Sequence, residues 1–226
     1  MRSWESLPPS LQKDAVRPYY DRLKQKSGSL AAKRVFDAVT AFLMLLLLFP
    51  LMLVIALWVA LDSPGGVFFL QKRVTTCGRV FRIVKFRTMV SRAETLGSSV
   101  TVSNDSRVTR AGKILRKLRL DELPQLLNVL KGDMSFVGTR PEVEKYVACY
   151  TDEMMATLLM PAGITSLASI RFKDEERLLS GAEDPDKVYV ETILPQKMAY
   201  NLEYLKNFGF FSDIALMFRT VAAVLR

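Results

Sequence analysis

The chain has 226 residues, a length typical of one domain with a small appendage. Its 32 basic residues outnumber 23 acidic ones, which gives a net charge of +9, and no histidine is present. Histidine acid–base catalysis and histidine-ligated metals are therefore excluded. The two cysteines, Cys77 and Cys149, match no metal-binding spacing and predict reduced thiols in a cytosolic domain. The charge suits nucleic acid, anionic lipid or a phosphorylated substrate, and no recognisable nucleic-acid-binding module favours the first.

Residues 1–31 are polar and basic. Ser10 is a candidate cap for one short helix, and Pro18 is placed to open a second helix that ends near Lys26. A segment lying on the surface, at the membrane interface, and a disordered tail are both compatible with this composition. The segment is not a signal peptide, because the apolar stretch that follows starts too late and is too long.

An apolar stretch of 24 uncharged residues runs from Ala38 to Leu61. As an unbroken helix it would reach about 36 Å, more than the ~30 Å hydrocarbon core of a bilayer, so a spanning helix is the first interpretation. Pro50 argues against it, because a proline in mid-helix removes a hydrogen bond and bends the helix.

The flanks of the apolar stretch also argue against spanning. Seven cations stand on each side: Lys13, Arg17, Arg22, Lys24, Lys26, Lys33 and Arg34 before it, and Lys72, Arg73, Arg79, Arg82, Lys85, Arg87 and Arg92 after it. Positive charge favours the cytoplasmic side, so both ends are expected there. Half-helices of 12 and 11 residues on either side of Pro50 would each reach about 17 Å, roughly half the core depth. The sequence therefore predicts a re-entrant helix over residues 32–62, broken at Pro50.

Short strands and a basic helix are predicted next. Val67–Val74 and Gly78–Arg87 predict a β-hairpin, since apolar and polar residues alternate in the second segment. Residues 91–106 are small and polar and predict a loop. Arg110–Leu118 predicts a basic amphipathic helix whose apolar side faces a core or the membrane surface, although a solvated charged face is the simpler alternative.

The last third of the chain is mostly helical in pattern. Helices are predicted over Glu144–Leu159, over Val188–Phe208 with a restart near Pro195, and over Ile214–Leu225, with a break at Pro161–Thr165. The fold class is thus α+β and mainly helical. Its parts are a basic extension at 1–31, a re-entrant membrane helix at 32–62, and a small cytosolic domain at 63–226 that holds a short β-hairpin and amphipathic helices at the interface.

The stretch LDELPQLLNVLKGD, residues 120–133, places two acidic residues side by side among cations. A carboxylate pair in such surroundings suggests phosphate chemistry, in which cations hold an anionic substrate and a carboxylate attacks it or carries a metal. Pro124 is tolerated only in a first turn, so the helix is expected to begin near Asp121 and to end at Gly132. A helix N-terminus also favours phosphate.

Two alternatives stay open for these residues. Asp121 and Glu122 point about 100° apart on a helix and are expected to do different jobs, but they could also be a helix cap and a first-turn acid. Arg140, fixed between a glycine turn and Pro141, could aim its guanidinium at a phosphate or only shape the turn.

Taken together, these residues resemble the bacterial sugar transferase family, the monotopic polyprenyl-phosphate phosphoglycosyl transferases. The resemblance runs from about Lys33 to the C-terminus and rests on five segments: KRVFD at 33–37, VFFLQKR at 67–73, KFRTM at 85–89, LDELPQLLNVLKGDMSFVG at 120–138, and RPE at 140–142. The first 30 residues lie outside it.

The resemblance implies transfer of a sugar-1-phosphate from a nucleotide diphosphate sugar, expected to be UDP-linked, to polyprenyl (undecaprenyl) phosphate, releasing a nucleoside monophosphate. Asp121 would attack the sugar-bearing phosphate to form a covalent intermediate, and Glu122 would hold Mg²⁺. The implied substrate-binding residues are Lys85, Arg87, Arg116 and Arg140, and the implied break of the membrane helix is Pro50.

The resemblance also implies a place for the chain: the bacterial inner (cytoplasmic) membrane, with the active site on its cytoplasmic face, at the first membrane step of surface glycan assembly. The implied partners are the nucleotide sugar, the polyprenyl phosphate and the lipid bilayer, with no nucleic acid. A homo-oligomer is neither required nor excluded.

Two departures from the family pattern are present. Thr139 replaces the usual first proline of the Pro-Arg-Pro turn, and Asn201 stands where many members carry an acidic residue. A different class, a non-catalytic basic scaffold that binds anionic lipid or nucleic acid at a membrane, accounts for the charge and the apolar stretch. It does not account for the dyad followed by Pro124.

Overall fold

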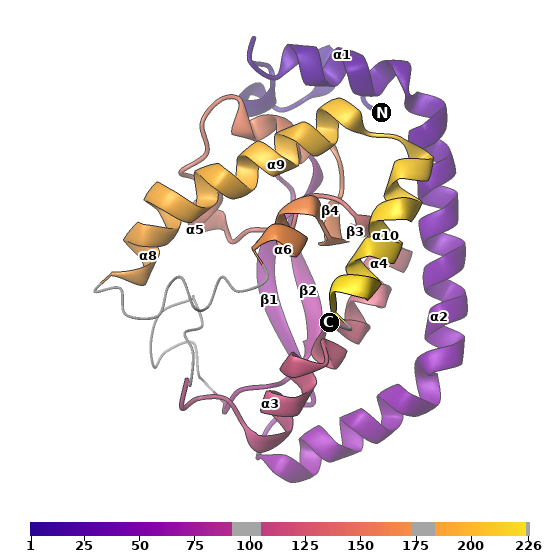
Figure 1. Ribbon diagram of the computed structural model, residues 1–226, viewed down its shortest axis with the longest axis vertical. Coiled ribbons are helices and arrows are strands. Elements are labelled where there is room, and N and C mark those ends of the chain that lie inside the picture. The colour runs from indigo at the N-terminus through magenta and orange to yellow at the C-terminus, as the bar shows by residue number, and fades with distance from the viewer. Residues whose placement is uncertain (92–104, 173–183, 225–226) are drawn as a thin grey trace.

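The structure is a computed structural model that describes residues 1–91, 105–172 and 184–224. It is mainly helical, with two small two-stranded sheets and one long apolar helix near the N-terminus, as the fold class predicts. Figure 1 shows that long helix, α2, running along one side of the molecule, while the strands lie in the middle, with α10 between them and α2 in this view. The predicted loop at 91–106 lies largely outside the described residues.

The N-terminal segment is folded against the rest of the chain. Two short 3₁₀ turns, Trp4–Ser6 and Pro9–Leu11, precede α1, which spans Arg17–Gln25 and confirms the helix expected after Pro18. Apolar side chains of this segment, among them Leu11 and Leu23, are fully buried in one cluster with α9. Figure 1 shows α1 beside α9 at the top of the molecule. The disordered-tail alternative is therefore wrong.

Helix α2 spans Ser27–Asp62 without interruption. The predicted division into two half-helices at Pro50 is wrong in this respect, because the helix continues through the proline. A proline lacks one N–H and crowds one carbonyl, which bends a helix without having to end it. Figure 1 shows that α2 changes direction along its length and curves around the other elements.

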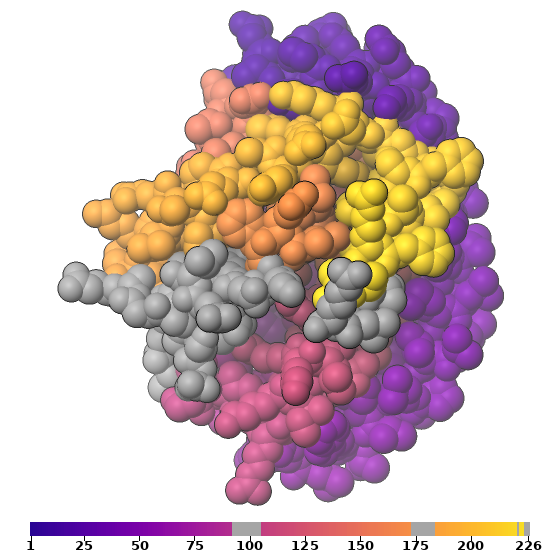
Figure 2. Space-filling view, viewed as in Figure 1, coloured from indigo at the N-terminus to yellow at the C-terminus, as the bar shows by residue number. Residues whose placement is uncertain are grey.

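The surface of α2 is apolar over most of its length. In Figure 2 the purple side chains of this region form one flank of the molecule. Thirteen large apolar side chains of α2 are exposed: Val35, Val39, Phe42, Leu43, Leu46, Leu47, Phe49, Leu51, Leu53, Val54, Leu57, Trp58 and Leu61. Among the described residues, α2 is the single helix long and apolar enough to cross a membrane by length and composition.

The predicted hairpin is confirmed. Strand β1, Phe68–Val74, pairs antiparallel with β2, Val80–Phe86, so that Phe68 lies opposite Phe86. A 3₁₀ turn at Thr76–Gly78 joins the strands. The second sheet was not predicted: β3, Met134–Val137, pairs in parallel with β4, Ala162–Thr165, in a segment expected to be a break.

Helix α3, Arg110–Lys117, confirms the basic helix, and its N-terminus is capped by Thr109, whose hydroxyl accepts a hydrogen bond from the Gly112 N–H at 3.0 Å. The predicted helix over residues 144–159 is wrong as one piece. The structure has a short helix α5, Glu144–Val147, and a separate 3₁₀ turn at Met154–Leu159.

The C-terminal part is helical, as predicted. Helix α6 spans Leu167–Arg171 and α8 spans Pro185–Val188. A π-helical turn at Tyr189–Ile193 then leads into α9, Leu194–Asn207, whose second residue is Pro195, and α10 covers Phe210–Val224.

One hydrophobic cluster positions the acidic motif. It joins Ala41 of α2, Leu126 and Val129 of helix α4 (Leu126–Lys131), Ile83 of β2, and Leu216 of α10. The α4 helix is thus held between the apolar helix and the two sheets, and the residues just before it are fixed with it.

Candidate active site

The dyad lies in a 3₁₀ turn, Leu120–Gln125, that leads directly into α4. The expected α-helical start at Asp121 is therefore wrong by five residues: the α-helix begins at Leu126, and Pro124 lies inside the preceding 3₁₀ turn. A fixed proline φ suits a 3₁₀ turn as well as a first α-turn. The end of α4 is as predicted, at Gly132 with φ 85°.

Two contacts fix α4 in place. Arg34 of α2 donates hydrogen bonds to the Val129 and Leu130 carbonyls at 2.7 and 2.8 Å, which satisfies the C-terminal end of the helix. The Asn128 side chain lies along the edge of β2, where it accepts from the Val84 N–H at 3.0 Å and donates to the Arg82 carbonyl at 2.8 Å. The dyad is consequently held against β2.

Glu122 is bound by two cations through one oxygen. Its Oε1 accepts from Lys85 Nζ at 2.9 Å and from Arg140 Nη2 at 3.1 Å. Burial alone would raise the pKa of Glu122, but Lys85 and Arg140 hold it well below its usual range. Burial in turn lowers the pKa of Lys85, which Glu122 opposes. The two cations therefore favour the ionised form of Glu122.

Asp121 is in a different state. It is 7% exposed, and its Oδ1 is buried without a hydrogen-bond partner. Burial raises the pKa of Asp121, and the charges of Lys85, Arg116 and Arg119 oppose that rise. A buried carboxylate oxygen without a partner is costly to a folded protein, so this one is better suited to receiving a ligand than to holding the fold.

Of the predicted substrate-binding residues, Lys85, Arg116 and Arg140 lie about the dyad. Arg116 donates through Nε to the Thr88 hydroxyl at 2.9 Å, and its charge acts on Asp121. Arg87 makes its hydrogen bonds to the end of α2 and not to the dyad. It is buried and donates to the Val59, Ser63 and Pro64 carbonyls at 3.1, 2.6 and 3.1 Å. Arg87 thus closes the C-terminal end of α2.

The turn that carries Arg140 is anchored by a buried polar cluster that the sequence did not reveal. Glu142 accepts from the Tyr189 hydroxyl at 2.6 Å and from Lys197 Nζ at 3.4 Å. Arg73 donates to the Pro141 carbonyl at 3.0 Å. Burial opposes ionisation of Glu142, but Lys197 and Arg73 keep its pKa below the ordinary value. Glu142 and Arg73 belong to sequence motifs of the family resemblance, whereas Lys197 lies 55 residues beyond Glu142 in the chain.

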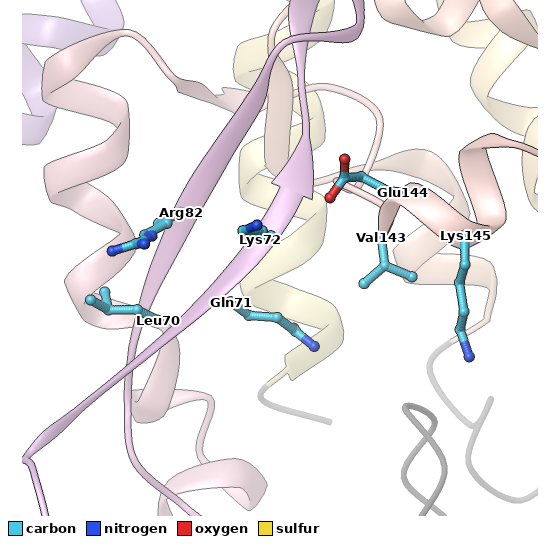
Figure 3. A pocket seen from close by; sticks show the side chains of 7 residues that line it. All are labelled: Leu70, Gln71, Lys72, Arg82, Val143, Glu144 and Lys145. Carbon is cyan, nitrogen blue, oxygen red and sulfur yellow. The ribbon is translucent and has the colours of Figure 1, made fainter. Parts of the chain in front are cut away.

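A hollow of about 500 Å³ opens beside this turn (Figure 3). Lys72 and Arg82, which face each other across the hairpin, lie on one side of it, and Val143, Glu144 and Lys145 lie on the other. None of the predicted site residues lines this hollow. The dyad and the hollow are therefore separate features: Arg140 binds Glu122 of the dyad, and the residues shortly after Arg140 line the hollow.

The residues at the dyad fit a magnesium ion. Both cations bind Glu122 through Oε1, and Asp121 Oδ1 is without a partner, so carboxylate oxygens, the donors Mg²⁺ prefers, are present. Within residues 1–91, 105–172 and 184–224, no group of three or more metal-ligating side chains occurs. A site with only the two dyad carboxylates suits Mg²⁺, which proteins commonly bind through one or two carboxylates and the phosphates of a substrate.

Asn201, which stands where many family members carry an acidic residue, is buried on α9, with its Nδ2 3.6 Å from Met198 Sδ.

The fold and the site together define a basic, helix-rich protein with one long apolar helix and an acidic pair in which Glu122 is bound by two cations and the buried Oδ1 of Asp121 has no partner. Residues 28–226 match the bacterial sugar transferase family, and the chain belongs to that family. The resemblance inferred from the motifs is confirmed, and with it the expectation that the chain is an enzyme of the transferase class.

Three relatives illustrate the match. The UDP-N-acetylgalactosamine-undecaprenyl-phosphate N-acetylgalactosaminephosphotransferase of Aeromonas hydrophila is 39% identical over 196 residues, which cover 85% of this chain but 43% of the relative. The UDP-glucose:undecaprenyl-phosphate glucose-1-phosphate transferase of Caulobacter vibrioides is 38% identical, over 85% of this chain and 69% of the relative. The exopolysaccharide production protein ExoY of Rhizobium meliloti is 32% identical, over 95% of this chain and 96% of the relative.

Proposed function

We propose that this chain transfers a sugar-1-phosphate from a UDP-sugar to undecaprenyl phosphate and releases a nucleoside monophosphate. Two of the relatives described above carry names that state such a transfer, one for N-acetylgalactosamine and one for glucose. These two differ in the sugar, so the sugar used by this chain is to be found by screening. The reaction would be a first membrane step in surface glycan assembly.

The difference between the two dyad carboxylates carries this proposal. Glu122 is held by Lys85 and Arg140, whereas the buried Oδ1 of Asp121 has no partner. Asp121 is therefore the carboxylate available for attack. Its oxygen forms a bond to the sugar-bearing phosphorus, the bond from that phosphorus to the bridging oxygen breaks, and the nucleoside monophosphate leaves with the electron pair.

In the second step Asp121 is the leaving group instead of the nucleophile. An oxygen of undecaprenyl phosphate forms a bond to the same phosphorus, and the bond to Asp121 breaks to return the carboxylate. Dividing one phosphoryl transfer into two steps through a covalent intermediate is what a fixed carboxylate nucleophile offers. Lys85 and Arg140 would neutralise the phosphates that come to lie beside Glu122, and Arg116 would do so beside Asp121.

Mg²⁺ would be held by Glu122, through the oxygen that Lys85 and Arg140 leave unused, together with phosphate oxygens of the substrate. When bound, the ion supplies positive charge that lets an anionic nucleophile approach an anionic diphosphate. Lys85 and Arg140 hold the pKa of Glu122 below its usual range, which favours the ionised form that binds the ion.

The contacts of α2 support a re-entrant membrane helix. Near its start, Lys33 is paired with Asp213 of α10 at 2.5 Å, and Asp37 accepts from the Ser135 hydroxyl of β3 at 2.7 Å. Near its end, Asp62 accepts from the Ala111 N–H of α3 at 3.0 Å. A helix that spans a bilayer has its ends on opposite faces, whereas both ends of α2 contact the same folded unit.

We therefore infer that residues 32–62 enter and leave the bacterial inner membrane by its cytoplasmic face, with residues 63–226 as the catalytic part on that face. The exposed apolar residues between the two anchored ends would lie in lipid. Tags placed at residue 5 and residue 226 should both report from the cytoplasm, and a periplasmic tag at residue 5 would contradict this topology.

The activity is tested by mixing the protein in detergent or nanodiscs with undecaprenyl phosphate and, in turn, UDP-N-acetylgalactosamine, UDP-glucose and UDP-galactose. Release of UMP that depends on the lipid and is lost in Asp121→Asn is expected with at least one donor. A non-catalytic scaffold would release none with any donor.

A further inference from the structure

Arg119 joins α3 to the turn that carries the dyad, and its backbone is unusual. Its φ of 57° and ψ of 18° lie in the left-handed region. Among the described non-glycine residues, only Arg119 and Cys77 have a positive φ. The side-chain carbon of an L-residue is crowded in this conformation, and glycine adopts it without that cost. The turn itself therefore does not call for an arginine, which suggests that the side chain has a use.

The side chain of Arg119 is exposed, and within the described parts of the chain its guanidinium makes no hydrogen bond or ion pair. The other cations near the dyad are engaged, since Lys85 and Arg140 bind Glu122 and Arg116 binds Thr88. Arg119 nevertheless lies close enough for its charge to oppose the effect of burial on the carboxyls of both Asp121 and Glu122. It is a cation at the dyad that is not committed to the fold.

The surroundings of Arg119 place it at the membrane side of the site. Just before it, Ile114 of α3 (47%) and Leu118 at the end of that helix (53%) are exposed. The start of α3 is fixed to the end of the apolar helix, because Asp62 of α2 accepts from the Ala111 N–H. Figure 1 shows α3 next to the lower end of α2. Arg119 thus follows directly on two exposed apolar residues, in a segment whose start is bonded to the end of the proposed membrane helix.

We propose that Arg119 binds the phosphate of the lipid acceptor, a phosphate monoester on a long apolar chain. This rests on the proposed function. The apolar side chains of α3 would lie at the membrane surface, and Arg119 would draw the lipid phosphate from that surface towards the dyad. There an acceptor oxygen forms its bond to the phosphorus held by Asp121, and the Asp121–phosphorus bond breaks to return the carboxylate.

The donor is assigned to other cations. Lys85 lies on β2 and Arg140 lies in the turn after β3, and both bind Glu122. Neither residue belongs to the segment of α3 and Arg119. The covalent step needs only the donor, so a residue that serves the acceptor should affect that step much less than it affects the acceptor KM. This separation makes the two half-reactions independent readouts.

The test uses Arg119→Asn, because asparagine tolerates the left-handed conformation and removes only the guanidinium. Lys117→Gln is the matched control: it removes one positive charge from an exposed side chain two residues away. The KM for undecaprenyl phosphate should rise about tenfold in Arg119→Asn, as expected for loss of a charge-assisted contact. The rate of adduct formation from the donor alone should change much less than the acceptor KM, and the Tm should not fall. Arg119→Lys should restore part of the acceptor affinity.

An unchanged acceptor KM in Arg119→Asn would overturn the proposal. An equal rise of the acceptor KM in Lys117→Gln would also overturn it, because the effect would then come from net positive charge in this region and not from contact with Arg119. A fall in the rate of adduct formation from the donor alone that is as large as the rise in the acceptor KM would also overturn it, because Arg119 would then serve the donor. If wild type gives neither adduct nor turnover, the proposed function fails, and Arg119 is tested by equilibrium binding of undecaprenyl phosphate in nanodiscs. Equal affinity of wild type and Arg119→Asn would then refute it.

Discussion

Two buried carboxylate clusters lie on either side of the turn at Arg140, and they are built differently. Glu142 is bonded by Tyr189 and Lys197, and Arg73 fixes the neighbouring Pro141 carbonyl. In the dyad, Glu122 is equally well bound, but the Asp121 Oδ1 beside it has no partner. The comparison teaches that burial among cations does not by itself mark an active site; the dyad differs from the Glu142 cluster because one of its buried carboxylate oxygens has no hydrogen-bond partner.

The largest effect is expected at the unpaired carboxylate. Asp121→Asn should lower turnover by about a thousandfold or more, because an amide cannot act as the anionic nucleophile. The Tm should stay the same or rise, since the substitution removes a buried charge without a hydrogen-bond partner. Steady-state UMP release and thermal unfolding in detergent measure the two effects. A large loss of stability would mean that Asp121 holds the fold.

The Glu142 cluster should respond in the opposite way. Glu142→Gln leaves Lys197 buried without its countercharge and should reduce the free energy of unfolding by about 3 kcal/mol. The double variant Glu142→Gln/Lys197→Met should regain much of that loss, because it removes both charges. Glu144→Gln is the matched control, since Glu144 is exposed two residues further on, and it should change stability by less than about 0.5 kcal/mol.

Unfolding of the three variants in detergent provides the measurement. If Glu142→Gln unfolds like Glu144→Gln, the cluster does not anchor the turn, and the contrast between the two clusters is lost.

A smaller effect is expected at the residue that links the clusters. Arg140→Lys should lower kcat/KM about tenfold, because lysine keeps the charge but not the planar, two-pronged donor geometry of a guanidinium. The stability should be close to wild type, since Lys85 still binds Glu122. Initial-rate kinetics with the preferred donor would check this. Wild-type kinetics would show that Arg140 only shapes the turn.

The smallest effect concerns pH. Burial raises the pKa of Asp121 in the folded state, so its ionisation destabilises the fold above that pKa and not below the unfolded value of about 3.9. The stability gained by Asp121→Asn should therefore be fully present above the folded-state pKa of Asp121, should decrease as the pH falls below that pKa, and should vanish as the pH falls through about 4. Unfolding curves of both proteins at pH 7 and pH 4 test this; a gain that is independent of pH would show that Asp121 has an ordinary pKa.

The elements predicted correctly are those with a local cause. The hairpin follows from alternation along Val80–Phe86, and α3 follows from its cap at Thr109 and its basic amphipathic pattern. Strand β3 was missed because all four of its residues are buried, which leaves no alternation to detect. Its pairing with β4 depends on backbones that approach closely at Gly138 and Gly163, where a side-chain carbon on Gly163 would lie 2.2 Å from the Gly138 nitrogen.

In the site, too, features with a local cause could be predicted and features that depend on tertiary contacts could not. Adjacent carboxylates among cations identified Asp121 and Glu122 from the sequence, but the sequence could not say which of them is clamped. Arg87 and Lys85 look alike as basic residues of one strand motif, yet Arg87 closes the end of α2 and Lys85 binds Glu122. Such assignments depend on which distant carbonyl or carboxylate each cation meets, and only tertiary structure supplies that.

The central claim, that Asp121 is the open carboxylate and forms the covalent bond, is tested most directly by intact-protein mass spectrometry. Wild type is mixed with the preferred UDP-sugar in the absence of undecaprenyl phosphate, quenched, and mapped by peptide fragmentation. We predict a mass increase of one sugar phosphate located on Asp121, absent in Asp121→Asn and lost on addition of the lipid. An adduct on Glu122 would contradict the account, as would the absence of any adduct together with kinetics that require both substrates to be bound at once.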